Sequence, residues 1–423
     1  MTITTPLQGI KVLDMSRVLA GPWAGQMLAD LGADVIKVER PGKGDDTRAW
    51  GPPYMPAAAG YAVADATEAA YFQSANRGKR SLCVDIATPK GQDLIKRLVA
   101  QADVLIENFK VGSLAKYGLD FECLNTLNPR LVYCSITGFG QTGPYKDRAG
   151  YDFMIQAMGG LMSVTGSEDG EPMKVGVALA DIMTGLYASN AIQGALIYQL
   201  RTGQGQHIDL ALLDVQVASL ANQAMNYLAT GQNPKRLGNA HPNIVPYQAF
   251  ATADGHLILA VGNDKQFERF CKVAGAQQLV FDPRFQTNAL RVANRTLLIP
   301  KLMQLLKQQA TDWWLTELNA VGVPCGPICT LNEVFNNPQI QAREMKIDLD
   351  HEQLGKVPSV ANPIKLSATP LQYTQAPPML GQHTQVVLQD WLAMTEAEYT
   401  ALLSAQVMLK ARLGQSLGYN LET

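Results

Sequence analysis

One carboxylate in this sequence stands where an ionisable group is costly. Asp181 lies between the apolar residues 175–180 and the largely apolar residues 182–188, and burial of an isolated carboxylate is unfavourable unless something stabilises its charge. Two interpretations stay open. Asp181 could cap the first turn of a helix by accepting backbone N–H groups, which spacing alone favours, or it could be a functional carboxylate. The two roles are compatible because a helix N-terminus also stabilises an anion.

Sequence signatures of several enzyme classes are absent. The chain has no Gly-x-x-x-x-Gly-Lys-Ser/Thr phosphate loop, no Gly-x-Ser-x-Gly hydrolase turn and no His-Glu-x-x-His metal motif. The first predicted strand-to-helix turn, residues 16–22, does not read Gly-x-Gly-x-x-Gly, which weakens a nicotinamide-dependent interpretation. These absences count against ATP-driven ligases, the commonest hydrolases and dehydrogenases.

Composition and charge predict an ordinary globular protein that does not bind nucleic acid or membranes. Lys and Arg total 35 against 37 Asp and Glu, for a net charge of −2, with no long run of like charges. Six cysteines are scattered without the spacing of zinc ligands, so we expect reduced thiols and no metal. The first residues show no positive segment followed by an apolar one, and we expect a cytoplasmic protein.

The elements expected to position Asp181 form an α/β fold. Short β-branched runs alternate with helical segments in the first third of the chain, which is typical of a parallel sheet with crossover helices. Further helices are predicted at 152–161 and 181–200, with Gly203 as the stop, followed by a strand at 207–212. The five earlier strands are predicted at residues 10–13, 35–38, 81–84, 104–106 and 131–135, and the helices between them at 25–31 and 91–101.

A second domain is predicted to begin after a loop. Residues 231–246 are rich in Gly, Pro and Asn, as expected of a linker or an active-site loop. A hairpin is predicted over 247–253 and 256–261, with helices following to about residue 323, so this domain is expected to be α+β. A last helix is predicted at 385–392.

Several short segments, read in order along nearly the whole chain, form a recognisable set. The segments include Ala20-Gly21-Pro22, Leu31-Gly32-Ala33-Asp34-Val35-Ile36-Lys37-Val38-Glu39, Asn76-Arg77-Gly78-Lys79-Arg80-Ser81, Ser135-Ile136-Thr137-Gly138-Phe139-Gly140, Arg148-Ala149-Gly150-Tyr151-Asp152 and Leu380-Gly381-Gln382-His383-Thr384. Each segment is weak alone, but the ordered set is specific, and it resembles the family III CoA-transferases.

The resemblance implies an active site. It implies that Asp181 is the catalytic nucleophile, and it favours this role over that of a helix cap. Arg40 and Lys116 would pair with the phosphates of coenzyme A. The family's coenzyme A contacts fall on Leu19, Ala20, Arg40, Val84, Asp85, Asn108, Phe109, Lys116, Ala149 and Tyr151.

The resemblance also implies an architecture. It suggests a large Rossmann-like domain built from residues 1–220 and 331–423, a small domain over residues 221–330 with its linkers, and a homodimer of two interlocked ring-like subunits. Coenzyme A would enter as an acyl-CoA substrate, and no metal or nicotinamide cofactor is expected.

The reaction implied is transfer of coenzyme A through a mixed anhydride and an aspartyl-CoA thioester on Asp181. A 2-methylacyl-CoA racemase of the same fold is an alternative, but there the motif reads Gly-His-Asp, whereas Tyr151 stands in this chain and is a poor base at neutral pH. A catalytically silent acyl-CoA-binding protein is a second alternative, disfavoured by the retained aspartate.

Two segments, residues 45–53 and 240–248, are most similar to the branch of succinyl-CoA:glutarate and related dicarboxylate transferases. A dicarboxylate needs a cation for its distal carboxylate, and Arg48, Arg77 or His241 could supply it. The expected donor is succinyl-CoA and the expected acceptor a dicarboxylic acid such as glutarate.

Overall fold

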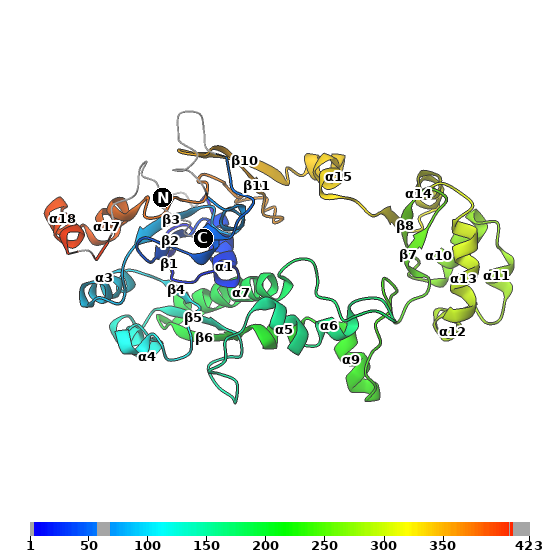
Figure 1. The fold of residues 1–423 in the computed structure, drawn as a ribbon, viewed down its shortest axis with the longest axis horizontal. Helices are drawn as coiled ribbons and strands as arrows, with labels where there is room; N and C mark the ends of the chain where they lie inside the picture. The colour runs from blue at the N-terminus through cyan, green and yellow to red at the C-terminus, as the bar shows by residue number, and fades with distance from the viewer. Residues whose placement is uncertain (1–3, 57–67, 406, 409–423) are drawn as a thin grey trace, which may run out of the picture. The chain divides into compact units, whose positions relative to one another are not determined.

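The computed structural model describes residues 4–56, 68–405 and 407–408 (Figure 1). Contacts divide the chain into two compact units. The first comprises Met1–Gly160, Gly176–Ala221 and Gln341–Thr423, and the second Leu161–Val175 and Asn222–Ile340. Residues 1–3 and 409–423, at the two ends of the predicted large domain, lie outside the described residues.

The first unit is built on a six-stranded parallel sheet of order β3-β2-β1-β4-β5-β6, which confirms the predicted α/β class. This is the strand order of Rossmann folds. Strands β1 to β3 extend the sheet to one side and β4 to β6 to the other, so the order of strands reverses between β1 and β4. Val12 of β1 pairs with Val35 on one side and Val104 on the other, as expected of β-branched strands covered on both faces. The strands are β1 (Lys11–Asp14), β2 (Asp34–Glu39), β3 (Lys79–Cys83), β4 (Val104–Glu107), β5 (Val132–Thr137) and β6 (Gln206–Ala211).

Helices cover both faces of this sheet (Figure 1). Helices α1 (Ala20–Asp30) and α7 (Leu179–Thr202) share one apolar core with Val12, Val104 and Val132. On the other face α3 (Pro89–Val99), α4 (Phe121–Leu127) and α17 (Thr384–Leu392) pack around Leu13, Leu105 and Tyr133. Within its described residues, the other helical elements of this unit are η1 (Asp46–Ala49), α2 (Ala70–Gln73), η3 (Ala115–Tyr117), α5 (Asp152–Met158), α8 (Leu212–Ala218) and α18 (Glu396–Ser404).

The connection from β5 to β6 carries the candidate nucleophile. It runs through α5, leaves the first unit at Leu161–Val175, and returns as α7. Helix α7 ends at Gly203 with φ 74°, a left-handed conformation that glycine adopts without strain. The predicted stop is therefore confirmed. A separate antiparallel hairpin of β10 (Lys346–His351) and β11 (Gly355–Val360) belongs to the same unit.

The second unit has its own core. The hairpin predicted from the alternating pattern forms as β7 (Tyr247–Ala251) and β8 (His256–Ala260), and β9 (Cys325–Pro327) joins it. Phe250, Phe270 and Trp314 are buried in the core between this sheet and the helices. The helices of this unit are α6 (Leu161–Val164), α9 (Ala221–Thr230), α10 (Asp264–Val273), α11 (Gln278–Phe281), α12 (Asn288–Ala293), α13 (Arg295–Leu306), α14 (Thr311–Ala320), α15 (Leu331–Asn336) and α16 (Pro338–Ala342), with α9 and α16 crossing its boundaries by one or two residues.

Two fully buried ion pairs hold the first strand-to-helix turn. Lys79 Nζ lies 2.8 Å from Asp14 Oδ2, and it also donates to the Pro22 carbonyl. Lys37 Nζ lies 2.8 Å from Asp45 Oδ2 and donates to the Ser16 carbonyl. Because each buried charge has a partner of opposite sign, these pairs fix the loop that follows β1. Within the described residues, no helix is long and apolar enough to cross a membrane.

Candidate active site

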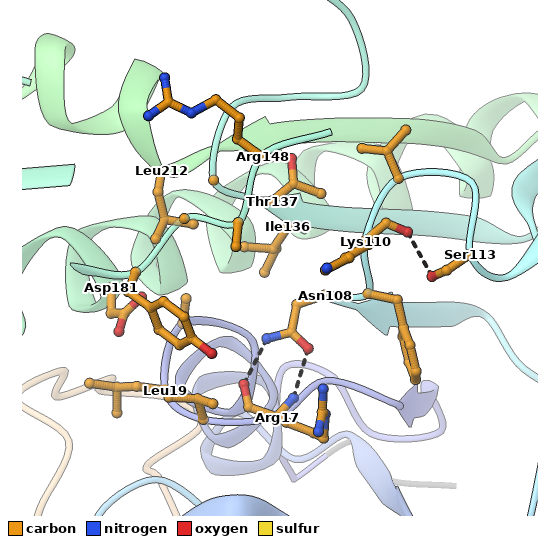
Figure 2. A pocket seen from close by; sticks show the side chains of 18 of the residues that line it. Arg17, Leu19, Asn108, Lys110, Ser113, Ile136, Thr137, Arg148, Asp181 and Leu212 are labelled. Carbon is orange, nitrogen blue, oxygen red and sulfur yellow. Dashed lines mark hydrogen bonds between the residues drawn. The ribbon is translucent and has the colours of Figure 1, made fainter. Parts of the chain in front are cut away.

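A cavity of about 400 Å³ opens at the carboxyl ends of β1, β4 and β5, next to the first turn of α7 (Figure 2). Its walls carry Leu19 after β1, Asn108 after β4, Thr137 at the end of β5, and Asp181. In open α/β sheets, ligands bind outside the carboxyl ends of the strands where the strand order reverses. This cavity, here called the Asp181 pocket, occupies that place.

A second cavity of about 350 Å³, the β2 pocket, lies beside it at the carboxyl ends of β2 and β3. Both cavities are lined by Arg17, Phe109 and Ser113, so they adjoin there. Together they form a continuous surface suited to a long ligand.

All ten residues to which the resemblance assigns coenzyme A contacts line one of these two pockets. The Asp181 pocket holds Leu19, Ala20, Asn108, Ala149 and Tyr151; the β2 pocket holds Arg40, Val84, Asp85 and Lys116; Phe109 lines both. They come from six separate stretches of the chain, brought together because parallel strands end at one edge of the sheet.

Asn108 joins the two halves of the sheet at the reversal point. Its side-chain amide donates to the Arg17 carbonyl at 2.7 Å, and its Oδ1 accepts from the Arg17 backbone N–H at 2.9 Å. Figure 2 shows both bonds. The Asn108 side chain thus connects the loops that follow β1 and β4 through two hydrogen bonds to the Arg17 backbone.

Asp181 is the third residue of α7, and the interpretation of its side chain as the helix cap is wrong. The helix begins at Leu179 with Ala178 at the N-cap. The capping acceptor is Asp152, whose Oδ1 receives the backbone N–H groups of Ala180 at 2.8 Å and Asp181 at 3.3 Å. The Asp181 side chain is therefore left to line the pocket.

The surroundings of Asp181 make its carboxylate unusually basic. Burial raises its pKa to about 7, and the negative charge of Asp152 adds to the rise. A carboxyl with such a pKa is half ionised near neutral pH, and its ionised form is a stronger nucleophile than an ordinary aspartate. The site can therefore support covalent catalysis by a carboxylate.

The end of β2 differs from that of a dinucleotide-binding protein. There an acidic residue accepts from the ribose hydroxyls. Here Glu39 is 4% exposed, and its carboxylate accepts from Arg48 at 2.8 Å and from Ser81 at 2.7 Å. Because Glu39 is occupied and Arg40 follows it into the β2 pocket, this end of the pocket suits a phosphate.

None of the three residues suggested for a distal carboxylate lines either pocket. Arg48 is buried between Glu39 and Glu68, at 2.8 Å from each. Arg77 pairs with Asp30 at 2.6 Å and donates to the Val360 carbonyl. Both guanidinium groups hold the fold together, which corrects their suggested role.

The third, His241, lies in the second unit. Its Nδ1 accepts from the Asn243 backbone N–H at 3.0 Å, and Arg295 donates to its carbonyl at 2.9 Å. Burial and the charge of Arg295 lower the pKa of His241, so near neutral pH it is a hydrogen-bond donor through Nε2 rather than a cation.

Sequence reasoning missed several polar residues of the Asp181 pocket. Arg17, Lys110, Lys146 and Arg148 line it, and Figure 2 shows the Lys110 side chain directed inward between Asn108 and Ile136. Arg148 and Asp152 belong to the motif that carried part of the resemblance, which was the available signal. Lys110 had none beyond its place directly after Asn108 and Phe109. Over the described residues, no cluster of three His, Cys, Asp or Glu side chains could hold a metal.

Comparison with known proteins identifies the family. The model of CoA-transferase family III matches residues 7–384. A succinate–glutarate CoA-transferase of Agrobacterium fabrum is 56% identical over 389 residues, which cover 91% of this chain and 95% of that protein. A succinyl-CoA:glutarate CoA-transferase of Homo sapiens is 44% identical over 403 residues, 95% of this chain and 90% of the other. A solved CAIB/BAIF family protein from Brucella suis superposes with a TM-score of 0.81 at 54% identity, covering 92% of this chain and all of that one. The chain therefore belongs to CoA-transferase family III.

Proposed function

We propose that this enzyme transfers coenzyme A from succinyl-CoA to glutarate or a similar dicarboxylic acid, with Asp181 as the nucleophile. The substrates are supported by the names of relatives 56% and 44% identical over nearly the whole chain. The nucleophile is supported by one structural observation above the others: a carboxyl whose pKa is raised to about 7 lines the pocket at the point where the strand order reverses.

The reaction proceeds by four exchanges at acyl carbons. The Asp181 carboxylate attacks the thioester carbonyl of succinyl-CoA and expels the coenzyme A thiolate, which gives a mixed anhydride of Asp181 and succinate. The thiolate attacks the aspartyl carbonyl, which expels succinate and leaves an aspartyl-CoA thioester. Glutarate attacks that thioester and releases the thiolate, which then attacks the glutaryl carbonyl to give glutaryl-CoA and free Asp181. Each bond broken is replaced by an activated one, so no nucleotide hydrolysis is needed.

Coenzyme A is proposed to span both pockets. Arg40 and Lys116 would bind nucleotide phosphates in the β2 pocket, and the pantetheine arm would pass Phe109 to bring the sulfur to Asp181. The free carboxylate of the acyl group would then lie among the basic residues of the Asp181 pocket. Lys110, Lys146 and Arg148 replace Arg48 and Arg77 as candidates for that contact.

A homodimer is also proposed. Helix α7 exposes a row of large apolar side chains, including Leu186 and Tyr187 near its start and Ile197, Tyr198 and Leu200 near its end. Apolar surface of this extent is typical of an interface, and light scattering of the purified protein would test it. A cytoplasmic location stays a prediction, supported by six free cysteines.

The mechanism is tested by mass spectrometry of the intact protein after incubation with succinyl-CoA, with and without hydroxylamine. A covalent adduct or a hydroxamate on Asp181, missing from Asp181→Ala, is the expected result. Proton exchange of a branched acyl-CoA in heavy water without any adduct would instead favour the racemase. Turnover of monocarboxylic acids, with glutarate, itaconate and mesaconate inert, would reject the dicarboxylate assignment.

A further inference from the structure

A buried acid that the transfer reaction does not use ends strand β4. Glu107 is 5% exposed, and the two residues that follow it, Asn108 and Phe109, line the pockets. Burial raises the pKa of Glu107 to about 7, and no charged neighbour is among the causes. A buried acid without a basic partner is unfavourable for folding, so the contacts of Glu107 must compensate for its burial.

The contacts of Glu107 form a chain across three strands. Its Oε2 accepts the backbone N–H of Phe109 at 2.8 Å. Ser135 is its direct partner in the β4–β5 register, and the Ser135 side chain lowers the pKa of the carboxylate, against the effect of burial. Ser135 Oγ lies 2.9 Å from His207 Nε2, and the His207 ring stacks on Phe121 with centroids 4.9 Å apart. Whether Ser135 Oγ or His207 Nε2 donates depends on the tautomer of His207.

These contacts control the residue at which the two pockets meet. The Phe109 ring also lies under the Arg17 guanidinium, 5.9 Å from ring centroid to Cζ. Asn108, between Glu107 and Phe109, clamps the Arg17 backbone from the other side of the crevice. The conformation of the turn after β4 therefore determines the positions of Asn108 and Phe109 relative to Arg17.

We propose that Glu107 is a positioning residue for coenzyme A, which holds the Phe109 N–H and thereby fixes the Asn108–Phe109 turn at the junction of the Asp181 and β2 pockets. The inference rests on the placement of coenzyme A in these pockets proposed above. It concerns binding of the thioester and not the chemistry at Asp181, so it predicts an effect on KM and on coenzyme A affinity with kcat unchanged.

The test compares Glu107→Met with Glu107→Gln. Met keeps the volume of the side chain but cannot hold the Phe109 N–H, so the turn is expected to loosen while the apolar side chain packs in the core and the fold is kept. Gln retains a carbonyl oxygen for Phe109 and an amide for Ser135. Glu122→Met, at an exposed acid of α4, is the matched control. Calorimetry measures the affinity for coenzyme A itself. Steady-state kinetics with succinyl-CoA and glutarate gives KM and kcat, and thermal unfolding reports whether each variant is folded.

In Glu107→Met, the Kd for coenzyme A and the KM for succinyl-CoA are expected to rise about tenfold, since an N–H left without its acceptor weakens the turn. In Glu107→Gln and Glu122→Met both should stay within about twofold of the unmodified enzyme. Ser135→Ala, a milder change, should raise them about threefold.

Unaltered coenzyme A affinity in folded Glu107→Met would overturn the inference. An equal loss of coenzyme A affinity in the Met and Gln variants would also overturn it, because the effect would then come from the charge of Glu107. If Glu107→Met fails to fold, an unaltered affinity in Ser135→Ala decides against it. Because calorimetry with coenzyme A needs no acceptor acid, a failure of glutarate as substrate is distinguished from a failure of this inference.

Discussion

The charge of Asp152 should set the pH at which Asp181 becomes active. Asp152→Asn removes that charge but leaves a side-chain oxygen able to accept from the Ala180 and Asp181 N–H groups, and asparagine is as good a helix cap as aspartate. The variant therefore separates the electrostatic effect of Asp152 from its structural one.

The size of the effect follows from the two causes of the raised pKa. Burial is the larger, so Asp152 accounts for less than half of the rise from 3.8 to about 7. One pKa unit corresponds to about 1.4 kcal/mol of repulsion between the two carboxylates. We expect the pKa of Asp181 to fall by about one unit in Asp152→Asn.

The pH dependence of kcat/KM for succinyl-CoA measures this pKa because it reports groups of the free enzyme. Only ionised Asp181 attacks, so kcat/KM should rise with pH and level off above about 7 in the unmodified enzyme. The inflection should move to about one unit lower in Asp152→Asn. Asp147→Asn, at an exposed acid in the same loop region, is the control and should leave the profile in place. Superimposable profiles for Asp152→Asn and the unmodified enzyme would show that the charge of Asp152 does not raise the pKa of Asp181.

Three other outcomes are expected. The pKa of Asp181 is raised on folding, so its contribution to stability is present at low pH and is lost as pH rises through about 7. Asp181→Asn should therefore melt at a higher temperature than the unmodified protein at pH 8 but not at pH 4. A difference in melting temperature that does not depend on pH would argue against a buried carboxylate. Lys79→Met leaves Asp14 buried without its partner, and urea unfolding should show a loss of about 3–5 kcal/mol, whereas a loss below about 1 kcal/mol would mean that water reaches the pair. Arg77→Met should lower the midpoint of unfolding through unpaired Asp30 while the KM for glutarate stays unchanged; a selective rise in that KM would restore Arg77 to the substrate site.

The sequence by itself predicted the parallel sheet and the family. Strands such as β2 and β4 are short segments rich in Val and Ile, and α7 ends at a glycine in a left-handed conformation, so local patterns alone indicate them. The ordered motifs placed ten residues that line two adjoining pockets, because motif residues in α/β proteins gather at the carboxyl ends of the strands.

The tertiary structure decided which polar side chains are available for chemistry. The sequence alone suggests that Arg48 and Arg77 are free cations. Each is in fact paired with a buried acid of another element, 9 and 47 residues away, and no local pattern reveals such a partner. The cap of α7 likewise comes from Asp152, 28 residues before the Ala180 N–H that it accepts. Sequence spacing determines which elements form, whereas pairing of charges and backbone donors depends on elements meeting in space, and that was settled only by the fold.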